Sequence, residues 1–287
     1  MTPVRYIILL VSLLLIFSGC EKEIEVDLPR TENEIVVEAY INQLDPLFNY
    51  VILSRSVNFF QPGVGIVPVK GAQVFITEGT VAGTDTNWNT SGKWQLTELF
   101  PDSIPGIYFS FGLTGKLEHV YKLEVFADGK YVHSITNIPP IVPLDSLSYT
   151  VVINPDDNKD TGRFMSIHFL EPVPKGNCYR AMYRIGGDTS YFGWGSIFHG
   201  DDAFNDDFVN GVYRNFTYGR NFRYNDTVNY YFSCIDRMAF NFWESYETIR
   251  NNGGPFSTPV QLKSNVQNAI GSFTGMAVTK KKIIIRN

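Results

Sequence analysis

Apolar and polar residues alternate along many short segments of this chain, and this alternation limits the fold more than any other feature of the sequence. In residues 34–42 (EIVVEAYIN), for example, Ile35, Val37, Ala39 and Ile41 fall on one side. The segments 49–56, 72–77 and 120–126 alternate in the same way. A period of two residues is typical of β-strands that bury one face, so the sequence predicts an all-β fold.

Turn residues separate these strand candidates. Asp128-Gly129 lies between segments 120–126 and 130–136, and both residues tolerate the positive φ angles of a two-residue hairpin turn. Short strands separated by turns are typical of a β-sandwich. We therefore predict that residues 34–138 form an immunoglobulin-like or transthyretin-like sandwich domain.

A proline-rich segment, residues 139–146, follows this domain and contains Pro139, Pro140 and Pro143. Proline cannot donate a ladder hydrogen bond and stiffens the chain. We interpret the segment as a linker between two domains, and a long loop within one domain is the alternative.

Residues 147–287 are predicted to form a second β-rich domain with one C-terminal helix. Its strand candidates are 147–153, 164–170, 178–185, 228–235 and 282–285. The helix candidate is 240–250 (FNFWESYETIR), in which Phe242, Tyr246 and Ile249 form one apolar stripe.

The first 19 residues have the parts of a secretory signal peptide. A basic start precedes the apolar run 6–17, which is shorter than the roughly 20 residues that cross a bilayer as a helix. The segment Phe17-Ser18-Gly19-Cys20 resembles a lipobox. Cleavage after residue 19 would leave a lipid on Cys20 as the membrane anchor, with residues 20–33 as a tether.

Charge gives further expectations about location and partners. The tether is acidic, and an acidic stretch directly after a lipidated cysteine resembles a signal for export to the outer leaflet. We therefore expect a lipid-anchored outer-membrane protein that is exposed at the cell surface, with the periplasmic face as the alternative. The formal net charge of −5 argues against binding to nucleic acid.

Cys178 and Cys234 each lie within a strand candidate. Outside the cytoplasm such a pair can be oxidised, but a disulfide needs Cα atoms about 4.4–6.8 Å apart. A disulfide and two buried free thiols therefore both remain open.

The loop 200–210 (GDDAFNDDFVN) is the best candidate for a metal site, and calcium is the ion considered. Its carboxylates belong to Asp201, Asp202, Asp206 and Asp207. Ca²⁺ binds 6–8 oxygen ligands, but the loop lacks the spacing of an EF-hand. A solvated loop without any cofactor is the preferred interpretation.

Aromatic residues are concentrated in the second half, where 19 of the 42 lie between Tyr179 and Trp243. Most of them are expected to fill the core. Aromatic residues near glycines are candidates for stacking on a ligand or anchoring a partner, because they combine a large contact area with a polar group. These ligand-binding candidates are Tyr191, Phe192, Trp194 and Phe198.

Catalytic motifs are not evident. Residues 271–275 (GSFTG) do not place serine at the centre, as a nucleophile elbow does. The four histidines, His119, His133, His168 and His199, are expected to be structural. The sequence therefore predicts a protein that is not an enzyme.

Five segments, in this order, make the chain similar to one family of bacterial lipoproteins. They are CEKEIEVDLP at 20–29, IVVEAYI at 35–41, PVKGAQVFIT at 68–77, NIPPIVPLDSL at 137–147 and NAIGSFTG at 268–275. The chain resembles domain-of-unknown-function family 4249, lipoproteins of diderm bacteria. The resemblance implies no activity and no catalytic residue.

Members of that family are often encoded beside outer-membrane TonB-dependent transporters. The resemblance therefore implies that the protein binds a nutrient or partners such a transporter. The alternative is a structural or adhesive cell-surface protein without a small-molecule ligand.

Overall fold

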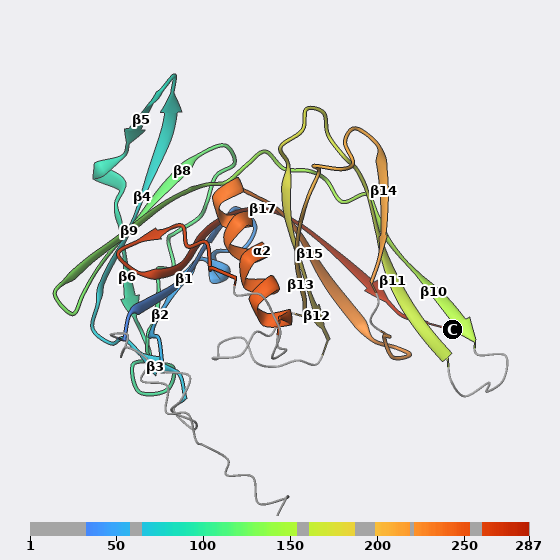
Figure 1. The fold of residues 1–287 in the computed structure, drawn as a ribbon, viewed down its shortest axis with the longest axis horizontal. Helices are drawn as coiled ribbons and strands as arrows, with labels where there is room; N and C mark the ends of the chain where they lie inside the picture. The colour runs from blue at the N-terminus through green and yellow to red at the C-terminus, as the bar shows by residue number, and fades with distance from the viewer. Residues whose placement is uncertain are drawn as a thin grey trace, which may run out of the picture. The chain divides into compact units, whose positions relative to one another are not determined.

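The computed structural model describes residues 33–57, 65–153, 161–186, 199–218, 221–252 and 260–286, without the side chains of residues 161 and 199–202. Asn33–Asn287 forms one compact unit. Figure 1 shows its strands and the one longer helix found within the described ranges. The all-β prediction, with one helix near the C-terminus, is confirmed.

The described elements run from β1 near the N-terminus to β17 near the C-terminus. They are β1 (Ile35–Asn42), η1 (Pro46–Phe48), β2 (Tyr50–Arg55), β3 (Val67–Pro68), β4 (Gln73–Ala82), β5 (Asp85–Trp88), η2 (Thr90–Gly92), β6 (Trp94–Glu98), β7 (Ile107–Phe109), β8 (Val120–Ala127), β9 (Lys130–Asn137), β10 (Ser146–Ile153), β11 (Thr161–Leu170), β12 (Cys178–Ile185), β13 (His199–Asn205), β14 (Tyr213–Thr217), β15 (Thr227–Ile235), α2 (Arg237–Asn251), β16 (Val266–Gln267) and β17 (Ile270–Ile284).

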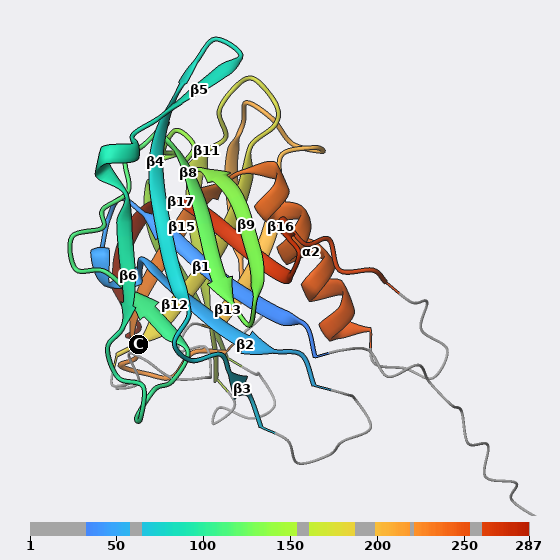
Figure 2. The same ribbon diagram turned by 90° about the vertical axis from the view of Figure 1, so that its left-hand side faces the viewer.

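Among the described residues, a 14-stranded sheet runs in the order β13-β12-β15-β17-β1-β2-β7-β6-β4-β8-β9-β16, with β3 and β5 at its side. Figure 2 shows β4, β8 and β9 side by side. The predicted hairpin joins β8 to β9, and Asp128 and Gly129 have φ angles of 52° and 72°. The sheet turns back on itself, since the amide of Gly275 in β17 donates to Thr136 Oγ1 of β9 at 2.9 Å.

The long strand β17 joins the two halves of the chain. It pairs in parallel with β1, the first strand, and antiparallel with β15 of the second half. The two predicted domains, 34–138 and 147–287, are therefore not separate units, and residues 139–146 are a connection within one unit. The predicted strand 282–285 covers only the last three residues of β17, because the small and polar residues of its first half do not alternate.

A second, three-stranded sheet has the order β10-β11-β14. Its inner residues Met165, Ile167 and Phe169 pack in the same core cluster as Tyr179 of β12 and Phe232 of β15. That cluster also contains Val37 and Val125 of the first half. The hydrophobic core is thus continuous through both halves.

The helix α2 begins three residues earlier than predicted, because Asp236 is its N-cap and accepts a hydrogen bond from the amide of Ala239 at 2.8 Å. Its buried face is formed by Ala239, Phe240, Phe242, Trp243 and Ser245. The predicted stripe is therefore wrong in part, since Tyr246 and Ile249 are exposed. None of the helices within the described ranges has the length and apolar character needed to cross a bilayer.

Candidate functional site

Two loops lie together at one end of the three-stranded sheet and its neighbours, and they hold part of the predicted acidic site. The first joins β11 to β12 (residues 171–177), and the second joins β13 to β14 (residues 206–212). Both lie at the top of Figure 1. The amide of Glu171 donates to the carbonyl of Val212 at 3.0 Å, which holds the loops together.

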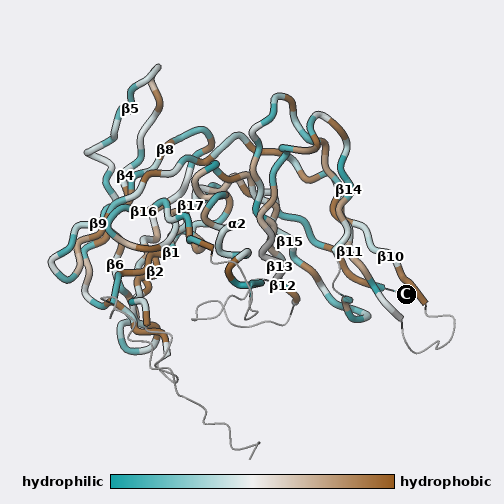
Figure 3. The backbone as a smooth tube through the Cα atoms, viewed as in Figure 1, coloured by the Kyte–Doolittle hydropathy of each residue, from teal (hydrophilic) through white to brown (hydrophobic). Residues whose placement is uncertain are grey.

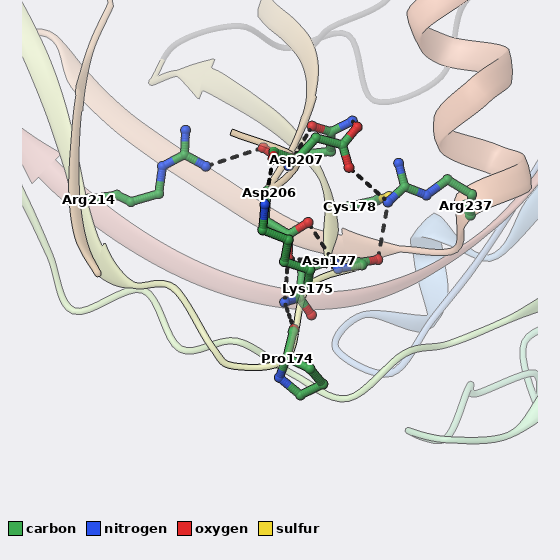
Figure 4. Close-up of polar contacts among 10 residues, drawn as sticks. Pro174, Lys175, Asn177, Cys178, Asp206, Asp207, Arg214 and Arg237 are labelled. Carbon is green, nitrogen blue, oxygen red and sulfur yellow. Dashed lines mark hydrogen bonds and ion pairs between the residues drawn. The ribbon is translucent and has the colours of Figure 1, made fainter. Parts of the chain in front are cut away.

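Asp206 connects these loops through its carboxylate (Figure 4). The carboxylate accepts hydrogen bonds from the amide of Gly176 at 2.9 Å, the amide of Asn177 at 3.0 Å and Asn177 Nδ2 at 3.0 Å. Burial alone would raise the pKa of Asp206, but these hydrogen bonds outweigh it, and the pKa lies below its ordinary value. Asp206 is therefore a structural clamp.

Asp207 also contacts protein groups. Its Oδ2 accepts a hydrogen bond from Asn205 Nδ2 at 2.8 Å, and its Oδ1 lies 3.6 Å from Arg237 Nη2. Lys175 Nζ donates to the carbonyl of Asp207 at 2.8 Å. Two of the four predicted calcium ligands thus bind neighbouring protein atoms, while the side chains of Asp201 and Asp202 lie outside the described residues.

At the start of the first loop, the buried side chain of Glu171 contacts Tyr179 and the partly buried Arg214. Glu171 is 1% exposed, accepts a hydrogen bond from Tyr179 Oη, and has Oε2 at 3.4 Å from Arg214 Nη1. Burial raises the pKa of Glu171. The Arg214 guanidinium lies over the rings of Phe169 and Phe204, at 5.7 and 5.4 Å. These contacts make a firm base for the loops above.

The same two loops, with the adjoining ends of β11 and β14, present large apolar side chains to solvent. We call this surface the apolar platform, and it consists of Leu170, Val173, Phe208, Val209, Val212 and Tyr213. Phe208 is 98% exposed and Val173 is 72% exposed. Leu170 pairs with Tyr213 across β11 and β14, and a Cβ on Gly211 would lie 2.6 Å from Val173 Cγ2.

Sequence reasoning missed the apolar platform because it treated residues 200–210 as an acidic loop. The available signal was the pair Phe208-Val209 between the turn-forming residues Asp207 and Asn210. Apolar residues within a polar turn belong to no alternating strand or helical stripe, so the sequence alone does not show what they contact. Their exposure became evident only when the two loops were brought together.

The two cysteines are free and buried. In the register of β12 with β15, Cys178 is opposite Ile235 and Tyr179 is opposite Cys234. The cysteines are therefore one position apart along the ladder, and their side chains point to opposite faces of the sheet. Cys234 packs in the larger core cluster and Cys178 in the cluster below α2. Of the two open alternatives, the structure has two buried thiols.

The predictions for the aromatic residues of the second half concern the core and a ligand-binding loop. Many fill the core as predicted; the ring of Tyr179 is stacked on that of Phe232 at 5.1 Å. Trp243 is covered by Arg180, whose guanidinium lies 3.4 Å from the ring centroid. The candidates Tyr191, Phe192, Trp194 and Phe198, like the predicted lipidation site Cys20, lie outside the described residues.

Three of the histidines contact neighbouring side chains within the fold. His119 Nδ1 lies 2.6 Å from Glu78 Oε1, and His133 is stacked on Tyr131. His168 Nε2 lies 2.7 Å from Ser148 Oγ on the outer side of the three-stranded sheet. The side chain of His199 lies outside the described residues.

The fold and these contacts define a β-rich protein whose described acidic groups hold loops in place and whose loops expose an apolar surface. The model of the family described as "Domain of unknown function (DUF4249)" matches residues 21–282, so the chain belongs to this family. This finding confirms the resemblance found in the sequence.

Two further comparisons add little. No curated protein matches the sequence. Among solved structures, the chain is similar to a DUF3823 family protein from Bacteroides uniformis, with 9% sequence identity, 88% of this chain and 100% of that chain covered, and a TM-score of 0.25. At that TM-score we draw no conclusion from the likeness.

Proposed function

We propose that this protein is a lipid-anchored, non-enzymatic protein of the outer membrane that binds a TonB-dependent transporter through the apolar platform. The lipid on Cys20 would hold it at the membrane, and the family's frequent association with such transporters names the partner. The nutrient-binding role would fall to Tyr191, Phe192, Trp194 and Phe198.

The observation that carries this proposal is the combination of exposed apolar side chains with a firmly held base. Exposed apolar residues that gather in one place are a feature of protein interaction sites. Phe208 projects from a turn that the buried carboxylate of Asp206 fixes, so little conformational entropy is lost when a partner covers the ring. Aromatic side chains in such positions contribute strongly to binding.

The test is purification of the native lipoprotein from outer membranes in mild detergent, with mass spectrometry of the proteins that remain bound. The variant carries Val173→Ser and Phe208→Ser. The matched control is Phe111→Ser, because Phe111 is 73% exposed but lies in the loop after β7. We expect the control to retain a stoichiometric barrel and the platform variant to lose about tenfold or more of it.

Equal recovery of the barrel with the platform variant would show that another surface binds it. If the wild-type protein is exposed at the cell surface but purifies without any bound protein, the transporter proposal is rejected and the structural or adhesive role is favoured. Measuring the unfolding midpoint of each variant separates loss of binding from loss of folding.

A further inference from the structure

The edge strands of the described sheets differ in how well they are protected. An exposed edge offers unpaired N–H and C=O groups to any other strand, and proteins usually block it with charge, proline or shortness. Most of these edges have such protection. The protected edge strands are β3, which contains Pro68; β5, which contains Asp85; β13, whose sequence includes Asp201 and Asp202; β14, which contains Arg214; and β16, which has only two residues.

The strand β10 has none of these devices. Its eight residues, SLSYTVVI, include no charge, proline or glycine, and among the described residues it pairs only with β11. It lies at the edge of the three-stranded sheet, and Figure 3 shows its hydrophobic end, Val151–Ile153, in brown. Val152 and Ile153 are exposed.

We infer that β10 pairs antiparallel with β10 of a second copy of this chain, which joins two three-stranded sheets into one across a two-fold axis. A second copy fits because the edge carries no charge, so self-pairing brings no like charges together. Alternate residues of β10 direct their N–H and C=O groups outward, and the same strand of a second copy, running antiparallel, can pair with this row.

The side chains of β10 also match themselves. With the axis at Tyr149, Ser148 lies opposite Thr150 of the copy, and Leu147 lies opposite Val151. Leu147 and Tyr149 already pack against the core, so pairing would continue the apolar inner face from one copy to the other. This inference does not depend on the proposed function.

The test is sedimentation of the purified native lipoprotein in detergent over a range of concentrations. Thr150→Lys and Thr150→Glu each place like charges near the axis, and the matched control is Asn215→Lys on β14, the opposite edge of the same sheet. We expect wild type and control to dimerise. We expect each Thr150 variant to dimerise about tenfold more weakly, and an equimolar mixture of the two to recover the wild-type affinity.

A monomer at every concentration would overturn the inference, as would a Thr150→Lys variant that dimerises like the control. A mixture that does not recover would also overturn it. Loss of a co-purifying barrel with Thr150→Lys, while the pure protein is monomeric, would assign β10 to a strand of that partner instead. Unchanged unfolding midpoints show that the variants fold.

Discussion

Gly271 of β17 lies so close to Val37 of β1 that a Cβ atom on Gly271 would be 1.8 Å from the Val37 carbonyl oxygen. Gly271 also has a φ angle of 138°, which side-chain-bearing residues rarely adopt. Gly275, further along the same strand, would place a Cβ 2.3 Å from the carbonyl oxygen of Asn137. The two glycines let β17 pass between β1 and β9.

We expect Gly271→Ala and Gly275→Ala each to destabilise the protein by at least about 3 kcal/mol, because backbone atoms must move to admit the methyl group. Chemical denaturation measures the change. Gly112→Ala is the control, since a Cβ there meets nothing within 4 Å. Wild-type stability for Gly271→Ala would show that β17 does not lie against β1 in this register.

Asp206→Asn should cost about 1–3 kcal/mol at neutral pH, because the amide group cannot accept all the hydrogen bonds from Gly176 and Asn177. The folded-state pKa of Asp206 is lowered, so its contribution is complete above the unfolded-state pKa of about 3.9 and is lost as pH falls through the lower folded-state pKa. The stability of the variant should therefore fall less steeply than that of wild type in this acid range.

Denaturation midpoints measured from neutral to acid pH test this expectation. Asp207→Asn is the matched control, because the Asp207 side chain is 54% exposed. An Asp206→Asn profile parallel to that of wild type would mean that the carboxylate is not the clamp.

Cys178 and Cys234 should both react with a thiol reagent only after the protein is unfolded. The reaction should not require a reductant, because the two thiols are free. Burial raises the pKa of each thiol to about 12, so the reactive thiolate is scarce in the folded protein at mildly alkaline pH. Thiol titration of a Cys20→Ser variant, with and without denaturant, counts them directly. Finding no thiol in denaturant would mean that the two cysteines form a disulfide.

Trp243→Ala should destabilise the protein by about 3–5 kcal/mol. The indole lies on the buried face of α2, donates to Thr274 Oγ1 at 3.0 Å and is covered by Arg180. Ile249→Ala on the exposed side of the helix should cost about 1 kcal/mol or less. Thermal and chemical unfolding measure the loss of stability in each variant. Equal losses would mean that the buried face of α2 is the stripe predicted from the sequence.

Local patterns were sufficient for much of the secondary structure. The alternation in residues 34–42 predicted β1, and Asp128-Gly129 predicted the hairpin, because both signals depend on neighbouring residues alone. The family could likewise be recognised from short segments in order. The start of α2 was missed because its N-cap, Asp236, follows β15 directly and shows no change of pattern there.

Long-range pairing was decided only by the tertiary structure. No local signal indicates that β17 returns to β1. Glycine is needed at 271 and 275 only because backbone atoms of Val37 and Asn137 lie close to these positions in the fold. The same holds for the candidate site. The order of residues shows which side chains are acidic and which are apolar. Whether Asp206 binds an ion or a backbone amide, and whether Phe208 is buried, depends on which distant loop lies beside it.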